Sequence, residues 1–174
     1  MLVILKLIQQ LVGALNSDGT PRQVAAGIAL GAVFGLTPLM NLHNLVLFGL
    51  ALILNISMAG VFLGWAVFIP VGFALDPLFD AIGRALLGAD ALRPLWTSLY
   101  NMPVVPFTNF NNSVVLGSFV FWLVTLLPAY FLWKWAVTRY RESVYARLKR
   151  MRIFQMVTAS KLYTTYRSLS RFVP

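Results

Sequence analysis

Few polar side chains in this sequence could do chemistry, and four of them lie close together in an apolar part of the chain. They are Asn41, His43, Asn44 and Asn55, in or beside the apolar run over residues 38–54. A hydrogen-bonding group left unsatisfied in apolar surroundings costs free energy, so these groups must be paired or hydrated. A single His without Cys or a nearby carboxylate does not indicate a metal site. We interpret the four residues as a candidate contact for lipid headgroups or a partner, with internal hydrogen bonding as the simpler alternative.

Three charged residues share a helix face further along the chain. Asp76, Asp80 and Arg84 are spaced four residues apart, which places them above one another on an α-helix. They could hold a headgroup or an ion; alternatively, Asp76 caps a helix that begins at Pro77 while Asp80 pairs with Arg84. The sequence shows no nucleophile elbow, Ser-x-x-Lys motif, phosphate loop or second carboxylate pair. It therefore predicts no catalytic residue, no metal and no cofactor.

The elements that must position these residues are strongly apolar. Of the 174 residues, 59% are apolar and 11% are charged, with a mean hydropathy of +0.78, whereas a soluble domain carries roughly 25% charged residues. So few polar side chains cannot cover a water-exposed surface. We therefore predict an all-α polytopic integral membrane protein. The absence of Cys excludes disulfides and thiol chemistry.

The chain divides into three predicted parts. Residues 1–15 predict an interfacial amphipathic helix of the mature protein, because Lys6 interrupts the apolar run and no small-residue cleavage site follows. Residues 20–137 form the membrane domain, and residues 138–174 form a basic amphipathic helix. Within the membrane domain, proline after a capping residue marks several helix starts, and we predict an irregular loop at 89–113 and helices over 21–36, 38–54, 57–75, 77–88 and 114–137.

The number of membrane crossings stays open. The runs at 57–75 and 114–137 are long enough to span, whereas those at 21–36 and 38–54 are shorter than the roughly 20 residues that a crossing needs. The two short runs form either a re-entrant helical hairpin, which gives two full spans in total, or two crossings of a thin bilayer, which gives four. Both arrangements leave the termini on one side.

Positive charge is concentrated at one end of the chain. Residues 1–133 hold four Lys or Arg and four Asp, whereas residues 134–174 hold ten Lys or Arg and a single Glu, which accounts for the net charge of +9. By the positive-inside rule we predict that the basic C-terminal end, and with it both termini, lies in the cytoplasm. Six basic residues are expected to contact the membrane surface and not nucleic acid: Arg139, Arg141, Arg147, Lys149, Arg150 and Arg152.

Glycine recurs at every fourth position in two of the predicted helices. Gly27, Gly31 and Gly35 lie in the first, and Gly60 and Gly64 lie in another. This spacing removes side chains along a stripe and lets a second helix approach to backbone distance. We predict that these glycines pack helices together, within the chain or in a homo-oligomer. A partner's transmembrane helix or a lipid tail is the alternative occupant of the stripe.

The order of these features resembles the bacterial inner-membrane family known as domain of unknown function 2062. The matching residues lie within 20–90 and comprise Gly27 to Gly31, Gly35, Pro38, Asn41 to Asn44, Asn55, and Gly60 to Pro70. The chain is a divergent member, because Phe68-Ile69-Pro70 and Asp76-Pro77 stand where the family has Asn-Pro. The resemblance implies an inner-membrane protein without known catalysis that accompanies a larger envelope protein of the AsmA-like, lipid-bridge type.

Three functions are compatible with these features. The leading hypothesis is a non-enzymatic inner-membrane subunit that anchors or assists a larger envelope protein in phospholipid transport between membranes. The second is a self-sufficient transporter of lipids or small solutes, in which broken helices and the Asn41 to Asn44 cluster line a path. The third is an enzyme that acts on lipid headgroups through Asp76, Asp80 and His43.

Overall fold

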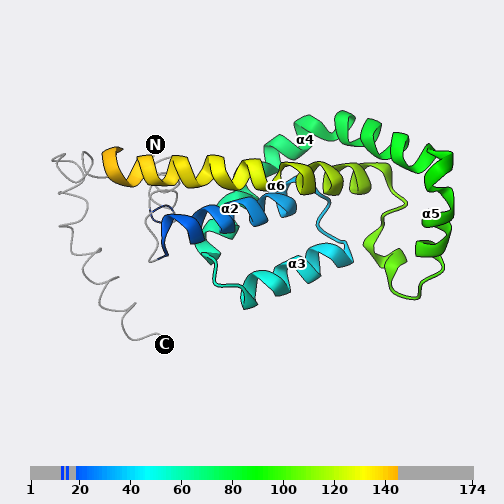
Figure 1. The fold of residues 1–174 in the computed structure, drawn as a ribbon, viewed down its shortest axis with the longest axis horizontal. Helices are drawn as coiled ribbons and strands as arrows, with labels where there is room; N and C mark the ends of the chain where they lie inside the picture. Colours follow the sequence, from blue (N-terminus) through cyan, green and yellow to red (C-terminus); the bar gives the residue numbers. More distant parts are fainter. Residues whose placement is uncertain (1–12, 14, 16–18, 145–174) are drawn as a thin grey trace. The chain divides into compact units, whose positions relative to one another are not determined.

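The computed structural model describes residues 13, 15 and 19–144, and all regular structure in this part of the chain is helical (Figure 1). The all-α prediction is therefore confirmed for these residues. The elements are α2 (Pro21–Leu36), α3 (Leu42–Ile53), α4 (Met58–Gly88), η1 (Asp90–Leu92), α5 (Arg93–Tyr100), η2 (Val105–Thr108), α6 (Ser113–Arg139) and the π-helical turn η3 (Tyr140–Val144).

Some predictions fall outside the described residues. They concern most of the interfacial helix at 1–15 and the basic segment from residue 145 onward, with Arg147, Lys149, Arg150 and Arg152. Arg139 and Arg141 are described, at the end of α6 and in η3. The chain divides into two units between Val137 and Thr138.

Helix α2 has the predicted bounds, and its start is fixed by a capping box. The Thr20 hydroxyl accepts the backbone N–H of Gln23 at 3.3 Å, and the Gln23 side chain accepts the N–H of Thr20 at 2.7 Å. Gln23 also donates from its side chain to Asn55 at 2.7 Å and accepts the N–H of Ser57 at its backbone carbonyl. These bonds hold the start of α2 against the segment between α3 and α4.

Helix α3 begins at Leu42, and the predicted start at residue 38 is wrong. Thr37 closes α2 and does not cap α3, because its backbone N–H and its hydroxyl both donate to the carbonyl of Val33. The side chain of Asn41 donates to the carbonyl of Pro38 at 2.5 Å and stabilises the intervening turn. Asn41 occupies the N-cap position of α3.

Helix α4 is a single helix of 31 residues, so the predicted break at Asp76-Pro77 is wrong. Proline lacks one backbone donor, but a helix held by its neighbours tolerates that loss. Here Phe79 is fully buried and Gly83 lies against α6, so packing continues past Pro77. Asp76 consequently lies inside the helix and does not cap one. The region predicted as an irregular loop at 89–113 also contains a regular helix, α5, with Pro94 in its first turn.

The other long helices pack on α4 in opposite directions. Helix α2 runs parallel to the first half of α4, since Gly27 lies at Ser57 to Val61 and Gly35 lies at Trp65 to Ile69. Helix α6 runs antiparallel to α4. Trp122 of α6 also donates its indole N–H to the carbonyl of Ala29 at 2.9 Å, which ties α6 to α2.

The apolar stretches of α4 and α6 are out of register. Phe68 packs against Trp133 with ring centroids 6.4 Å apart, and Phe79 lies against Gly117. The charged end of α4, from Asp76 onward, therefore lies beside the apolar beginning of α6. Conversely, Lys134 of α6 lies beside the apolar first half of α4.

Two helices in the described part of the chain are long and apolar enough to cross a membrane. They are α4 and the helix that begins at Ser113. Only 28% of the most apolar window of each is buried, whereas a core helix of a soluble protein is mostly covered. Helices α2 and α3 are apolar but shorter.

Candidate functional site

The turn between α2 and α3 is held by a polar network around Asn44. The Asn44 side chain donates to the Thr37 hydroxyl at 2.9 Å and to the carbonyl of Pro38 at 2.9 Å. Both Asn44 and Thr37 are buried. Because a buried polar group without a partner is costly, this network specifies how the two helices meet.

A loop 68 positions further along the sequence completes this network. Asn109 donates its side-chain N–H groups to the side-chain oxygen of Asn41 at 2.6 Å and to the carbonyl of Met40 at 3.3 Å. Its backbone is left-handed, with φ 55°, a conformation that Asn tolerates better than most residues. The segment before α6 is thereby attached to the turn. Asn109 was not predicted as a site residue, and its spacing from Asn41 gave no signal.

The four polar residues around the second apolar run do not form one site. Only Asn41 and Asn44 come together. His43 faces α6, where its ring lies 5.0 Å from that of Phe119 and its Nε2 atom has no partner among the described residues. Asn55 lies at the opposite end of α3 and accepts from Gln23. No group of three His, Asp or Glu residues in the described part of the chain could hold a metal.

The charged residues of α4 form a separate cluster against α6. Arg84 pairs with Asp80, as the spacing predicted, and the Ser113 hydroxyl donates to the other oxygen of Asp80 at 2.5 Å. The Asp80 side chain is 25% exposed, whereas that of Arg84 is 74% exposed. Each oxygen of Asp80 therefore has a partner, and the cluster fixes the start of α6 on α4. Asp76 lies one turn before it.

Glycines form the closest helix contacts. A Cβ atom on Gly27, Gly31 or Gly35 would lie 2.3, 2.1 or 2.7 Å from the backbone of α4 or of the residue before it. Gly60, Gly64 and Gly72 of α4 meet the backbone of α2 in the same way. A second contact of this kind was not predicted: a Cβ on Gly83 would lie 1.9 Å from the Ser113 carbonyl oxygen, and one on Gly117 would lie 1.8 Å from that of Phe79. Neither Gly83 nor Gly117 has another glycine four residues away on its helix, so they carry no periodic signal.

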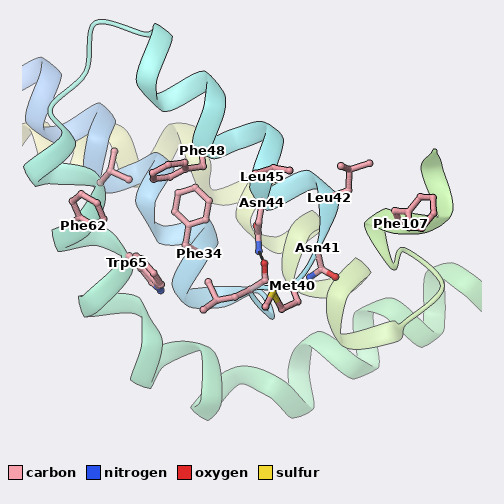
Figure 2. Close-up of a pocket in the computed structure, with 12 residues that line it drawn as sticks. Phe34, Met40, Asn41, Leu42, Asn44, Leu45, Phe48, Phe62, Trp65 and Phe107 are labelled. Atoms are coloured by element: carbon pink, nitrogen blue, oxygen red, sulfur yellow. Dashed lines mark hydrogen bonds between the residues drawn. The ribbon is translucent and has the colours of Figure 1, made fainter.

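An apolar groove of about 680 Å³ lies between α3 and the α2–α4 pair (Figure 2). We call it the α3 groove. Asn41 and Asn44 are its polar residues, and none of its lining residues is charged. The lining consists of Phe34, Leu39, Met40, Asn41, Leu42, Asn44, Leu45, Phe48, Val61, Phe62, Trp65 and Phe107. The sequence did not reveal this groove, although α3 contains no Asp, Glu, Lys or Arg.

Comparisons with known proteins agree with the resemblance seen in the sequence. Residues 6–145 match a family described as "Uncharacterized protein conserved in bacteria (DUF2062)", which extends the match well beyond 20–90. A protein of Treponema pallidum (strain Nichols), described as an uncharacterized protein, is 26% identical over 159 residues, covering 91% of this chain and 98% of the relative. No solved structure matches the chain significantly.

Proposed function

Because the chain belongs to the family of domain of unknown function 2062, we propose that it is a non-enzymatic subunit of a bacterial inner membrane that anchors or assists a larger envelope protein, in phospholipid transport between membranes. One observation carries this proposal: α3 is an apolar helix that the rest of the described chain leaves largely uncovered. Only Asn44 and Ala51 of its twelve residues are buried. Membrane lipid and a partner's transmembrane helix are the surroundings that suit such a surface.

The arrangement of helix ends supports a location of both termini in the cytoplasm. Val137, near the end of α6, packs in one cluster with Val24 of α2 and Leu63 of α4. The beginning of α2, the beginning of α4 and the end of α6 therefore lie at one end of the helix bundle. The basic residues from 134 onward follow directly, and by the positive-inside rule they hold this end in the cytoplasm.

Helix lengths support the re-entrant hairpin. The 16 residues of α2 and the 12 residues of α3 correspond to about 24 and 18 Å at 1.5 Å per residue, less than the roughly 30 Å of a hydrocarbon core. The 31 residues of α4 correspond to about 46 Å, which exceeds it. The hairpin thus begins and ends at the cytoplasmic end of the bundle without crossing.

Cysteine accessibility tests this topology, and the chain has no native Cys to interfere. In intact cells, Ser98→Cys in α5 is expected to react with a charged, membrane-impermeant maleimide, and Asn55→Cys is expected to react only after the membrane is opened. Met40→Cys, which is 92% exposed in the protein alone, is expected to react poorly because lipid surrounds it. Labelling of Met40→Cys as strong as that of Ser98→Cys would instead indicate four crossings.

Copurification tests the subunit role. From mild detergent, the unaltered chain is expected to carry a larger envelope protein that mass spectrometry identifies. Gly49→Leu should reduce this recovery several-fold, because Gly49 is partly exposed on α3 and has no atom within 4 Å of an added Cβ. Gly88→Leu is the matched control, since Gly88 is equally open but lies at the end of α4. Recovery of the chain alone at full yield would contradict the proposed role.

The polar groups of the site favour a subunit over an enzyme. Asn41, Asn44, Thr37 and Asn109 are engaged with one another or with backbone carbonyls. The oxygens of Asp80 are likewise taken by Arg84 and Ser113. Side chains committed to such bonds stabilise the fold and are poorly placed to bind a substrate. Replacing Asp80 is therefore expected to lower the stability of the fold.

A further inference from the structure

Helix α3 is attached to the protein at its two ends, and between them one of its faces packs on the core through Phe48 and Ala51. At its first residues, Asn44 bonds to Thr37 and to the turn after α2. Beyond its last residue, Asn55 bonds to Gln23. The α3 groove lies between these two attachments. A helix fixed in this way forms one wall of a cavity whose width is set by the fold.

Aromatic rings form much of the inner wall of the groove (Figure 2). Phe34 of α2 makes edge contacts with Phe48 of α3 and with Trp65 of α4, with ring centroids 6.1 and 6.2 Å apart. Phe62 stacks on Trp65 at 6.3 Å. Rings that pack against each other from three helices give a surface of defined shape. This surface offers no charge to a ligand.

The polar side chains at one end of the groove already have hydrogen-bond partners. Asn41 donates to Pro38 and accepts from Asn109, and Asn44 donates to Thr37 and Pro38. The two N–H groups of Asn44 are thus used and Asn41 keeps one at most, so the groove offers a charged headgroup little to bind. The occupant that fits is apolar along its whole buried length.

The size of the groove favours a narrow apolar occupant. A chain of about 16 to 18 methylene groups, each close in volume to the roughly 30 Å³ of a water molecule, occupies about 500 Å³ and fits within the groove. A partner helix is about 10 to 12 Å across with its side chains, so little more than one turn would fill about 680 Å³. The groove is thus suited to a single flexible hydrocarbon chain.

We propose that the α3 groove binds one acyl chain of a membrane phospholipid, held between the aromatic wall and α3 while the headgroup stays outside. This inference rests on the membrane location in the proposed function and adds to it a defined lipid site. Lipid bound here differs from lipid on the outer faces of α4 and α6, because residues of three helices of the same chain line one open groove around it.

Photocrosslinking tests this site directly. The full chain is reconstituted into vesicles of phosphatidylethanolamine and phosphatidylglycerol that contain a trace of phosphatidylethanolamine with a diazirine midway along one acyl chain. After illumination, mass spectrometry is expected to find label on Phe48, Phe62 or Trp65. Leu45→Trp, which places a larger side chain at the groove, should lower this labelling several-fold. Val46→Trp is the matched control, because Val46 is exposed on the same helix and does not line the groove.

The exposed residues Leu127 and Phe131 of α6 provide an internal reference. Label on α6 together with protected groove residues would overturn the inference and leave the membrane location intact, as expected if a protein segment fills the groove. Equal groove labelling in the two tryptophan variants would also overturn it, because lipid that contacts the protein nonspecifically would not distinguish them. Absence of label on both α6 and the groove would refute the membrane location itself, and with it the inference.

Discussion

Replacing Gly31 by alanine is expected to destabilise the folded protein by about 1–3 kcal/mol, the range for overpacking a close-packed contact. The new Cβ would lie 2.1 Å from the carbonyl oxygen of Val61 and 2.8 Å from its Cα atom. Both are backbone atoms, so no side-chain rotation can relieve the clash, and α2 must move away from α4. Unfolding in mixed micelles should show this as a lower SDS fraction at the midpoint.

The control is Gly49→Ala, a substitution of the same size at a position where the Cβ meets nothing within 4 Å. Alanine favours a helix over glycine by about 1 kcal/mol in soluble hosts, so this variant should be neutral or slightly stabilised. If the two variants unfold at the same SDS fraction, α2 and α4 do not pack through their glycines.

Replacing Asn44 by leucine is expected to cost about 1–3 kcal/mol, the penalty for leaving buried hydrogen-bonding groups without a partner. Leucine has the same branched outline but cannot donate to the Pro38 carbonyl or to the Thr37 hydroxyl. The turn between α2 and α3 should therefore loosen. Hydrogen exchange of the backbone amides over residues 37–45 should be faster in this variant, and its unfolding midpoint should be lower.

Asn111→Leu makes the same chemical change at an exposed position outside the network. It should leave both the unfolding midpoint and the exchange over 37–45 unaltered. Unchanged exchange in Asn44→Leu would show that Asn44 does not hold the turn. Helix α3 would then lack one of the two attachments described above.

Local patterns in the sequence were sufficient where a short-range interaction decides the structure. Thr20, Pro21 and Gln23 contain the whole capping box, and α2 has the predicted bounds. The four-residue spacing of Gly27, Gly31 and Gly35 located the face of α2 that touches α4. The pairing of Asp80 with Arg84 depends only on their spacing along one helix.

Tertiary contacts decided the features that the sequence did not reveal. Asp76-Pro77 has the pattern of a helix start, and only the packing of Phe79 and Gly83 keeps α4 continuous there. Asn109 joins Asn41 across 68 positions, a distance over which no local pattern extends. The α3 groove depends on how far α3 stands from α4, and residue types along one helix do not encode that distance.

The offset between α4 and α6 has a consequence for the surrounding bilayer. Between Phe68, level with Trp133, and Asp76, α4 advances eight residues, or about 12 Å. Only this band is free of charged residues on both helices, although snorkelling of Lys134 widens it. The hydrocarbon core of a bilayer is roughly 30 Å thick. If α4 and α6 cross it as proposed, acyl chains beside this pair meet a hydrophobic mismatch and must shorten or tilt.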